Sequence, residues 1–184
     1  MNKKLFGKKF FIIILLSLSA IIIGAFFANK FLVRPYIKYD TVDSEKVGQQ
    51  RTDDGFIYYS YLPYGDKDGR SEAMIVGYEG EKNELIFPNE VDGLTVSYIS
   101  EEFMFGNKVI ASADIPSSVD EIGEYAFAEC KNLKKVTIRN SKTKISMGVF
   151  VNSPNVVICA AEGSLAQAYA NEKKIQFEML DELN

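Results

Sequence analysis

Apolar residues recur along the second half of the chain at a fixed interval of 23 positions. Three columns keep this spacing over two successive steps, and a fourth keeps it over one. The columns are Ile99, Ile122 and Ile145; Met104, Phe127 and Phe150; Ile110, Leu133 and Val156; and Ile115 with Ile138. Matches at one offset in independent columns indicate a repeated supersecondary unit, the coil of a solenoid. One coil cannot cover its own apolar face, so neighbouring coils are expected to stack and the ends to be capped.

The clearest unit predicts how each coil folds. Residues 133–138 have the spacing L-x-x-L-x-L, which is typical of a short strand with Val136 and Ile138 facing inward. Turn residues, among them Pro116, follow the equivalent strand one unit earlier. Residues 122–127 then carry two inward apolar positions on what we expect to be a tight, partly helical return. The prediction is about three 23-residue coils over residues 99–158.

Both ends of the repeat show different patterns. At the C-terminal end, Ser164 and Gln167 have the spacing of a capping box, which predicts a helix to about Lys173. Residues 175–179 then alternate apolar and polar, as in a closing strand, so residues 159–184 form the predicted C-terminal cap. At the N-terminal end, two strand-like runs flank a polar turn at residues 65–70. They predict a capping hairpin within residues 55–98.

The N-terminus carries a separate hydrophobic signal. Residues 10–28 contain no charged side chain, and as a helix they would reach about 28 Å, the thickness of a bilayer core. The four lysines among residues 1–9 favour a cytoplasmic tail, so the rest of the chain is expected outside the cell membrane as a single-pass protein. A polar linker at residues 29–54 follows. The alternative is a signal peptide whose cleavage would leave a secreted protein.

Charge excludes one class of partner. The chain carries 21 Lys and Arg against 25 Asp and Glu, and from Asn29 onward the balance is 17 against 25, or −8. A surface of this sign repels phosphate backbones, and no basic cluster interleaved with aromatic residues is present. We therefore expect no nucleic-acid partner.

The residue types also argue against catalysis and metal binding. The sequence has no histidine, which removes the catalytic triads and the imidazole zinc sites. Cys130 and Cys159 are too few and too far apart for a thiolate cluster, and we expect two buried thiols. The acidic turn at residues 66–72 lacks the spacing of a calcium loop. No catalytic residue, cofactor or metal ligand is predicted.

The repeat also carries a resemblance to a known family. Residues 115–119 (Ile-Pro-Ser-Ser-Val), 122–127 (Ile-Gly-Glu-Tyr-Ala-Phe), Cys130 and residues 133–138 (Leu-Lys-Lys-Val-Thr-Ile) resemble the BspA-type leucine-rich repeats of bacterial surface proteins. The resemblance covers roughly residues 55–180. It implies a strand-rich α+β leucine-rich-repeat solenoid, an extracellular setting, and binding to proteins or surfaces rather than a reaction.

A candidate binding face follows from the strand alternation. If the apolar positions of residues 133–138 point inward, the residues between them point outward, and the same holds one coil earlier. Tyrosines of the N-terminal hairpin could supply an aromatic anchor beside this face. The candidate residues are Tyr59, Tyr61, Ala111, Ser112, Asp114, Lys134, Lys135 and Thr137.

Three function classes remain after these arguments. The leading hypothesis is a membrane-anchored binding or scaffolding module with an unknown protein or surface ligand as its partner. The second is an accessory membrane subunit that makes its contacts through residues 10–28, where Gly24 and Ala25 permit close helix packing. The third is an enzyme that uses carboxylates alone, although the adjacent acidic pairs of the sequence define no cleft.

Overall fold

The computed structural model describes residues 48–63 and 69–180 of the chain. The chain divides into two compact units, Met1–Tyr39 and Asp40–Asn184, and every described residue belongs to the second. Its elements in chain order are β1 (Gln50–Arg51), β2 (Phe56–Tyr61), β3 (Glu72–Tyr78), β4 (Glu84–Ile86), β5 (Glu90–Val91), β6 (Leu94–Ile99), β7 (Ser112–Ile115), β8 (Glu121–Ile122), β9 (Lys135–Ile138), β10 (Lys144–Ile145), β11 (Val157–Ala160), α2 (Leu165–Lys173) and β12 (Gln176–Met179).

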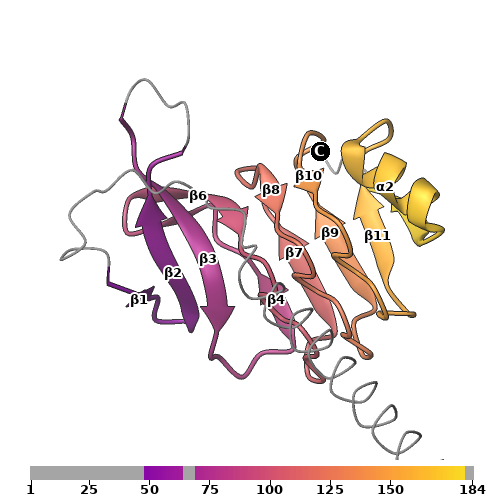
Figure 1. Ribbon diagram of the computed structural model, residues 1–184, viewed down its shortest axis with the longest axis horizontal. Helices are drawn as coiled ribbons and strands as arrows, with labels where there is room; N and C mark the ends of the chain where they lie inside the picture. The colour runs from indigo at the N-terminus through magenta and orange to yellow at the C-terminus, as the bar shows by residue number, and fades with distance from the viewer. Residues whose placement is uncertain (1–47, 64–68, 181–184) are drawn as a thin grey trace, which may run out of the picture. The chain divides into compact units, whose positions relative to one another are not determined.

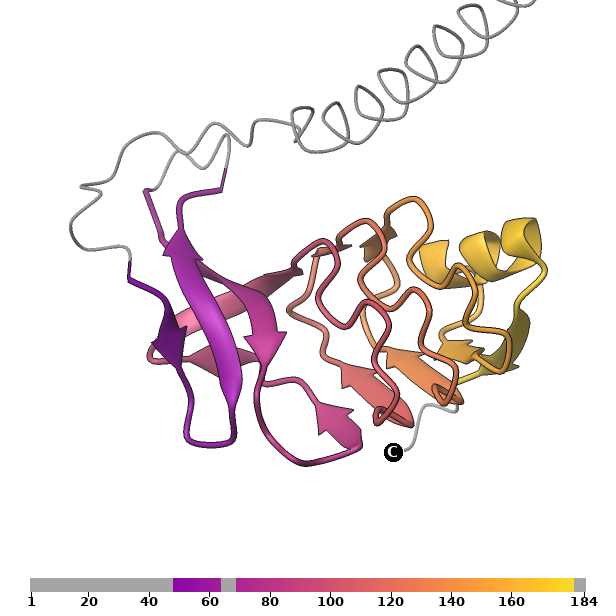
Figure 2. The ribbon, with the colours of Figure 1, turned by 60° about the horizontal axis from the view of Figure 1, so that its bottom comes forward.

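The strands form two sheets along one stack of coils (Figure 1). The five-stranded sheet has the order β12-β11-β9-β7-β4, and all its pairs are parallel. The seven-stranded sheet has the order β1-β2-β3-β6-β8-β10, with β5 paired to β6. Figure 2 shows the chain passing from one sheet to the other and back in each coil. This arrangement is the expected strand-rich solenoid.

The stack contains about five turns rather than the three that the 23-residue columns predict. Glu84, Ser112, Lys135, Val157 and Gln176 occupy one row across the five-stranded sheet. Successive members are separated by 28, 23, 22 and 19 positions, so the sequence period holds only in the middle of the stack. The first coil is longer because β5 and β6 form a small antiparallel pair within it. The parallel stack therefore begins at β4, inside the segment assigned to the N-terminal cap.

The predicted apolar columns line the interior. All their members are buried except Ile145, which is partly buried and packs against the core. On the five-stranded sheet the alternation points Leu85, Ala113, Val136 and Ile158 inward at matching positions. Because each inward side chain meets its equivalent on the next strand, every coil covers the apolar face of its neighbour.

Aromatic rings run through the core from one end of the stack to the other. Successive ring centroids lie 5.2, 5.4, 5.9, 5.9 and 6.1 Å apart, within the range of favourable aromatic contacts. The rings are Phe56, Phe87, Phe103, Phe127, Phe150 and Tyr169. This chain of contacts links the N-terminal hairpin to α2, so the caps and the repeats share one core.

The return segment of each coil is built from turns, and the expected partial helix is absent from residues 122–127. Tyr125 and Glu129 adopt φ angles of 58° and 60°, in the left-handed region. Such residues interrupt a right-handed helix. The peptide groups bond instead to the next coil, since Phe127 N–H donates to the Val149 carbonyl at 3.0 Å.

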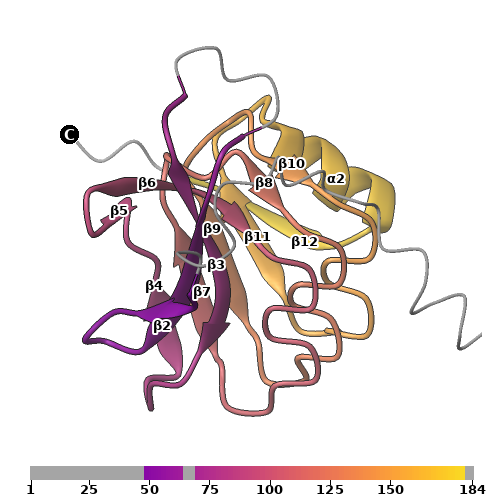
Figure 3. The same cartoon turned by 60° about the vertical axis from the view of Figure 1, so that its left-hand side comes forward.

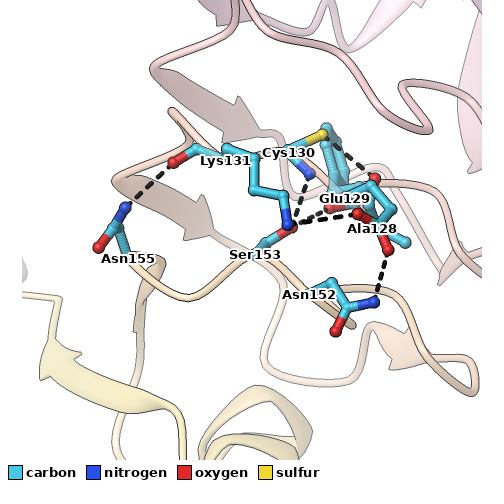
Figure 4. Close-up of polar contacts among 8 residues, drawn as sticks. Ala128, Glu129, Cys130, Lys131, Asn152, Ser153 and Asn155 are labelled. Atoms are coloured by element: carbon cyan, nitrogen blue, oxygen red, sulfur yellow. Dashed lines mark hydrogen bonds and ion pairs between the residues drawn. The ribbon is translucent and has the colours of Figure 1, made fainter.

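Buried polar groups at these turns also bond between coils (Figure 4). Ser153 Oγ accepts from the Cys130 N–H at 2.9 Å and donates to the Phe127 carbonyl at 2.8 Å. One coil earlier, Cys130 Sγ lies 3.1 Å from the Met104 carbonyl in the equivalent place. Cys130 and Cys159 are both free and buried, and burial raises the pKa of the Cys130 thiol to about 11. That thiol is therefore protonated and unreactive at neutral pH.

Different elements cover the two ends of the stack. At the N-terminal end β2 and β3 form an antiparallel hairpin, and β3 continues the seven-stranded sheet by parallel pairing with β6 (Figure 3). At the C-terminal end Ser164 caps α2 by accepting from the Gln167 N–H, and Ala166 and Ala170 face the core. The Gln167 side chain accepts from the Gly163 N–H rather than from Ser164, a small departure from the predicted capping box.

The predicted membrane segment, residues 10–28, lies outside the described residues, as do the tail at residues 1–9 and most of the linker. Among the residues that the structure describes, no helix has the length and apolar character needed to span a bilayer.

Candidate binding surface

The outward face of the five-stranded sheet is an exposed surface with two rows of side chains. Strand alternation and the pairing register define both rows. The first row is Glu84, Ser112, Lys135, Val157 and Gln176, and the second is Ile86, Asp114, Thr137, Cys159 and Glu178. We call these ten residues the outer rows.

Two ion pairs involve charged side chains of the outer rows. Arg139 binds Asp114 through two hydrogen bonds of 2.8 and 2.6 Å, in the planar geometry that suits guanidinium and carboxylate. Lys135 Nζ lies 3.7 Å from Glu178 Oε2 and reaches across β11 to do so. These charges offset one another, so the face carries pairs of opposite sign rather than one strong field.

One large apolar side chain stands exposed at the β4 edge of the outer rows. Ile86 on β4 is 74% exposed, which is unusual for a large aliphatic residue in a strand. Cys159 lies between Thr137 and Glu178 in its row but is only 4% exposed, so its thiol is not offered to a ligand. Ile86 is thus the exposed large aliphatic side chain of the outer rows.

Four of the eight predicted candidate residues lie on this face, and two more stand directly before its strands. Ser112, Asp114, Lys135 and Thr137 belong to the outer rows. Ala111 and Lys134 stand at the starts of the same two strands, where the Lys134 N–H donates to the Ala111 carbonyl at 2.8 Å. The register of β7 and β9 brings these residues side by side, and their role as a binding face stays a prediction.

The two predicted tyrosines lie elsewhere. Tyr59 and Tyr61 belong to β2 in the seven-stranded sheet, because the hairpin extends that sheet and not the five-stranded one. The Tyr61 hydroxyl is 2.7 Å from Ser97 Oγ and 3.4 Å from Glu72 Oε2, and burial raises the pKa of Tyr61 to about 12. The structure does not bring Tyr59 or Tyr61 to Lys135 to form the composite site expected from the sequence.

A shallow groove near the C-terminal end escaped sequence reasoning. It has a volume of about 930 Å³ and lies between the last turn of the stack and the end of α2. Tyr125, Met147 and Tyr169 are among its lining residues, with Lys173 and Lys174 at one side, and none of the lining residues is acidic. Met147 in this groove is 62% exposed, and exposure is not readable from the sequence.

The acidic side chains of the described residues form no metal-binding group. Within residues 48–63 and 69–180, no group of three or more Cys, Asp or Glu side chains converges in a way that could hold a metal ion. The acidic turn considered for calcium falls partly outside these ranges, since residues 64–68 are not described. The adjacent residues Glu101 and Glu102 are both exposed, and neither lines the groove near α2.

Comparison with known proteins identifies the repeat. Residues 84–172 match the family model of the BspA type leucine rich repeat region, in six copies. No curated protein matches the chain.

Solved structures with a similar arrangement come from three bacteria. A leucine rich cell surface protein from Faecalibacterium prausnitzii has 24% identity and a TM-score of 0.42, covering 76% of this chain and 31% of that one. A leucine-rich repeat protein from Bacteroides capillosus has 21% identity and a TM-score of 0.37, covering 61% of this chain and 71% of that one. The T. pallidum leucine rich repeat protein has 19% identity and a TM-score of 0.36, covering 66% and 54%.

This chain thus spans about a third of the Faecalibacterium protein and about half of the T. pallidum protein. The matched repeats run from β4 to the end of α2 and include four of the five strands that carry the outer rows. Residues 84–172 of the chain form a BspA-type leucine-rich repeat region.

Proposed function

We propose that this chain is a membrane-anchored, extracytoplasmic leucine-rich-repeat module that binds a protein or surface ligand and catalyses no reaction. The observation that carries the proposal is the outward face of the five-stranded sheet, where four of the predicted residues stand in the outer rows of the stacked coils. Residues 10–28 would supply the anchor. Repeat proteins commonly bind through such continuous strand surfaces.

The composition of the outer rows supports a protein contact of modest strength. A specific interface usually covers about 800 Å² on each partner and centres on an aromatic or arginine side chain. Here Arg139 already holds Asp114, and Ile86 supplies the large apolar side chain. We therefore place the contact across the outer rows, with Lys135 near its centre and the tyrosine hairpin outside it.

The partner contact can be tested by charge reversal. Capture from intact cells with the full chain as bait identifies a partner, and Lys135→Glu should then weaken its binding about tenfold, because the new carboxylate lies beside Glu178. The melting temperature should change little, since an exposed ion pair contributes at most about 1 kcal/mol. Binding affinity and thermal melting of the purified variants are the two measurements.

Two control variants decide whether the assigned face is correct. Glu124→Lys alters an exposed residue on the turn side, and Tyr61→Ala alters the hairpin on the other sheet. Both should leave affinity unchanged. If Glu124→Lys weakens binding while Lys135→Glu has no effect, the partner uses the turn side and the outer rows are not the site.

Membrane attachment makes a second measurable prediction. Protease added to intact protoplasts should remove the repeat domain and leave an N-terminal fragment in the membrane, because the lysines before residue 10 favour a cytoplasmic N-terminus. Immunoblotting with antibodies to each end follows both pieces. Recovery of a soluble form that begins between residues 25 and 30 would instead establish cleavage of a signal peptide.

A further inference from the structure

The last strand of the five-stranded sheet has a free edge. Among the described residues, β12 pairs only with β11. Leu180 N–H donates to the Ala160 carbonyl at 2.8 Å, which fixes the direction of the peptide groups along the strand. Since these groups alternate, the N–H and C=O of Phe177 and Met179 point away from β11. Unpaired strand edges of this kind readily accept another strand.

The core is also incompletely covered beside this edge. On β11 the inward residues Ile158 and Ala160 are fully buried. Their partners on β12 are Phe177, which is half-buried, and Met179, which is 58% exposed. Leu165 at the start of α2 is 49% exposed as well. At the opposite end of the same sheet, Phe87 is 2% exposed, because the hairpin covers it. The C-terminal end thus combines a free edge with exposed apolar side chains.

The sequence of β12 is complementary to itself in one antiparallel register. With Phe177 opposite the Phe177 of a second copy, Ile175 stands opposite Met179 and Gln176 opposite Glu178. Apolar residues then meet on the inner face, and an amide meets a carboxylate on the outer face. If the pairing register shifted by one position, Phe177 of one copy would lie opposite Glu178 of the other. If it shifted by two positions towards the C-terminus, the Glu178 residues of the two copies would lie opposite each other.

Backbone bonding favours the same register. Two bonds form between the paired Phe177 residues, and the Met179 N–H of each copy can reach the Ile175 carbonyl of the other. The Ile175 N–H is already used, since it donates to the Ala170 carbonyl at 2.9 Å. If the register instead shifted by two positions towards the N-terminus, the two Phe177 residues would no longer pair. Only two backbone hydrogen bonds between the copies would then remain. Residues 165–180, which include this edge strand, carry two lysines and two glutamates.

We propose that two copies of this chain associate through a two-fold antiparallel pairing of β12 with its equivalent, which joins the two five-stranded sheets into one. The interface is isologous, so it closes at a dimer. The outer rows of both copies then face the same side, and a partner of the repeat surface meets two copies of it. The dimer does not depend on which ligand the outer rows bind.

Disulfide cross-linking of the full chain in its membrane tests the pairing. Gln176 and Glu178 are both exposed, and opposite residues of a non-hydrogen-bonded antiparallel pair lie close enough for a disulfide. Under a mild oxidant, the double variant Gln176→Cys/Glu178→Cys should run as a covalent dimer on non-reducing gels. Each single variant should stay monomeric, and co-expression of the two single variants should restore the dimer.

A second pair of variants tests the edge itself. In the double-cysteine background, Met179→Lys should reduce the covalent dimer about tenfold, because it buries an ammonium group against Ile175 of the other copy. Met179→Leu should leave the dimer intact. Cys130 and Cys159 are buried and common to all variants. A monomeric double variant, a ladder of larger species, cross-linking by Glu178→Cys alone, or an undiminished dimer with Met179→Lys would each overturn the proposal.

Discussion

Replacing Phe127 with aspartate should prevent the chain from folding. The ring is fully buried, stacks on Phe150 at 5.9 Å, and contacts Phe103 and Phe87 on its other side. An unpaired carboxylate at this place costs several kcal/mol in desolvation, and the lost ring contacts add to that cost. The sum is comparable with the whole stability of a small domain, about 5–15 kcal/mol. Circular dichroism melting and the soluble yield of the full chain measure the effect.

A matched control separates burial from the chemistry of the substitution. Phe105 lies in the same coil as Phe103 but is 54% exposed, so Phe105→Asp should melt within a few degrees of the unchanged chain. Phe127→Leu should fold with a lowered melting temperature, because it keeps an apolar side chain and leaves a small cavity. A cooperative, unshifted melt of Phe127→Asp would show that the column of Met104, Phe127 and Phe150 does not form the interior.

Replacing Ser153 with alanine should produce the second largest loss. Its hydroxyl accepts from the Cys130 N–H and donates to the Phe127 carbonyl, and both bonds are buried (Figure 4). Alanine leaves an N–H and a carbonyl without partners in the interior, at a cost of about 1–3 kcal/mol. The free energy of unfolding from denaturant titration measures this difference.

The equivalent residue one coil earlier supplies the control. Cys130 Sγ lies 3.1 Å from the Met104 carbonyl, so a thiol can serve where Ser153 places a hydroxyl. Ser153→Cys should therefore lose clearly less stability than Ser153→Ala. Equal losses would mean that side-chain volume, rather than the hydrogen bonds between coils, determines stability at this position.

The middle of the stack was predictable because its coils are nearly identical. The columns through Phe127 and Leu133 repeat at 23 positions, and both are buried as expected. The outward residues of β7 and β9 followed from the same register. The first coil was missed because an inserted strand pair, β5 with β6, displaces Glu84 from the 23-residue frame. A single period cannot reveal a coil whose length differs from it.

The placement of the tyrosine hairpin was not predictable for a different reason. The local pattern of β2 and β3 indicates a hairpin, but the sheet that it joins depends on pairing between Ile75 and Ile99, which are distant in the sequence. Alternation within a strand shows which residues share a face and says nothing about the neighbouring strand. Ser97 and Glu72 accept or share hydrogen bonds with the Tyr61 hydroxyl, and only the fold reveals them as its partners.

The hydrogen bonds between successive coils have a consequence for how such a chain can change over generations. Phe127 N–H bonds to Val149 and Met104 N–H to Ala126, so each coil meets the next through equivalent groups. A gene that gains or loses one whole repeat in frame therefore inserts or removes a unit whose two surfaces already match its new neighbours. A change of any other length has to be accommodated within one coil, as the β5–β6 pair is in the first. Selection can thus adjust the reach of the molecule in steps of one coil while its two caps remain the same.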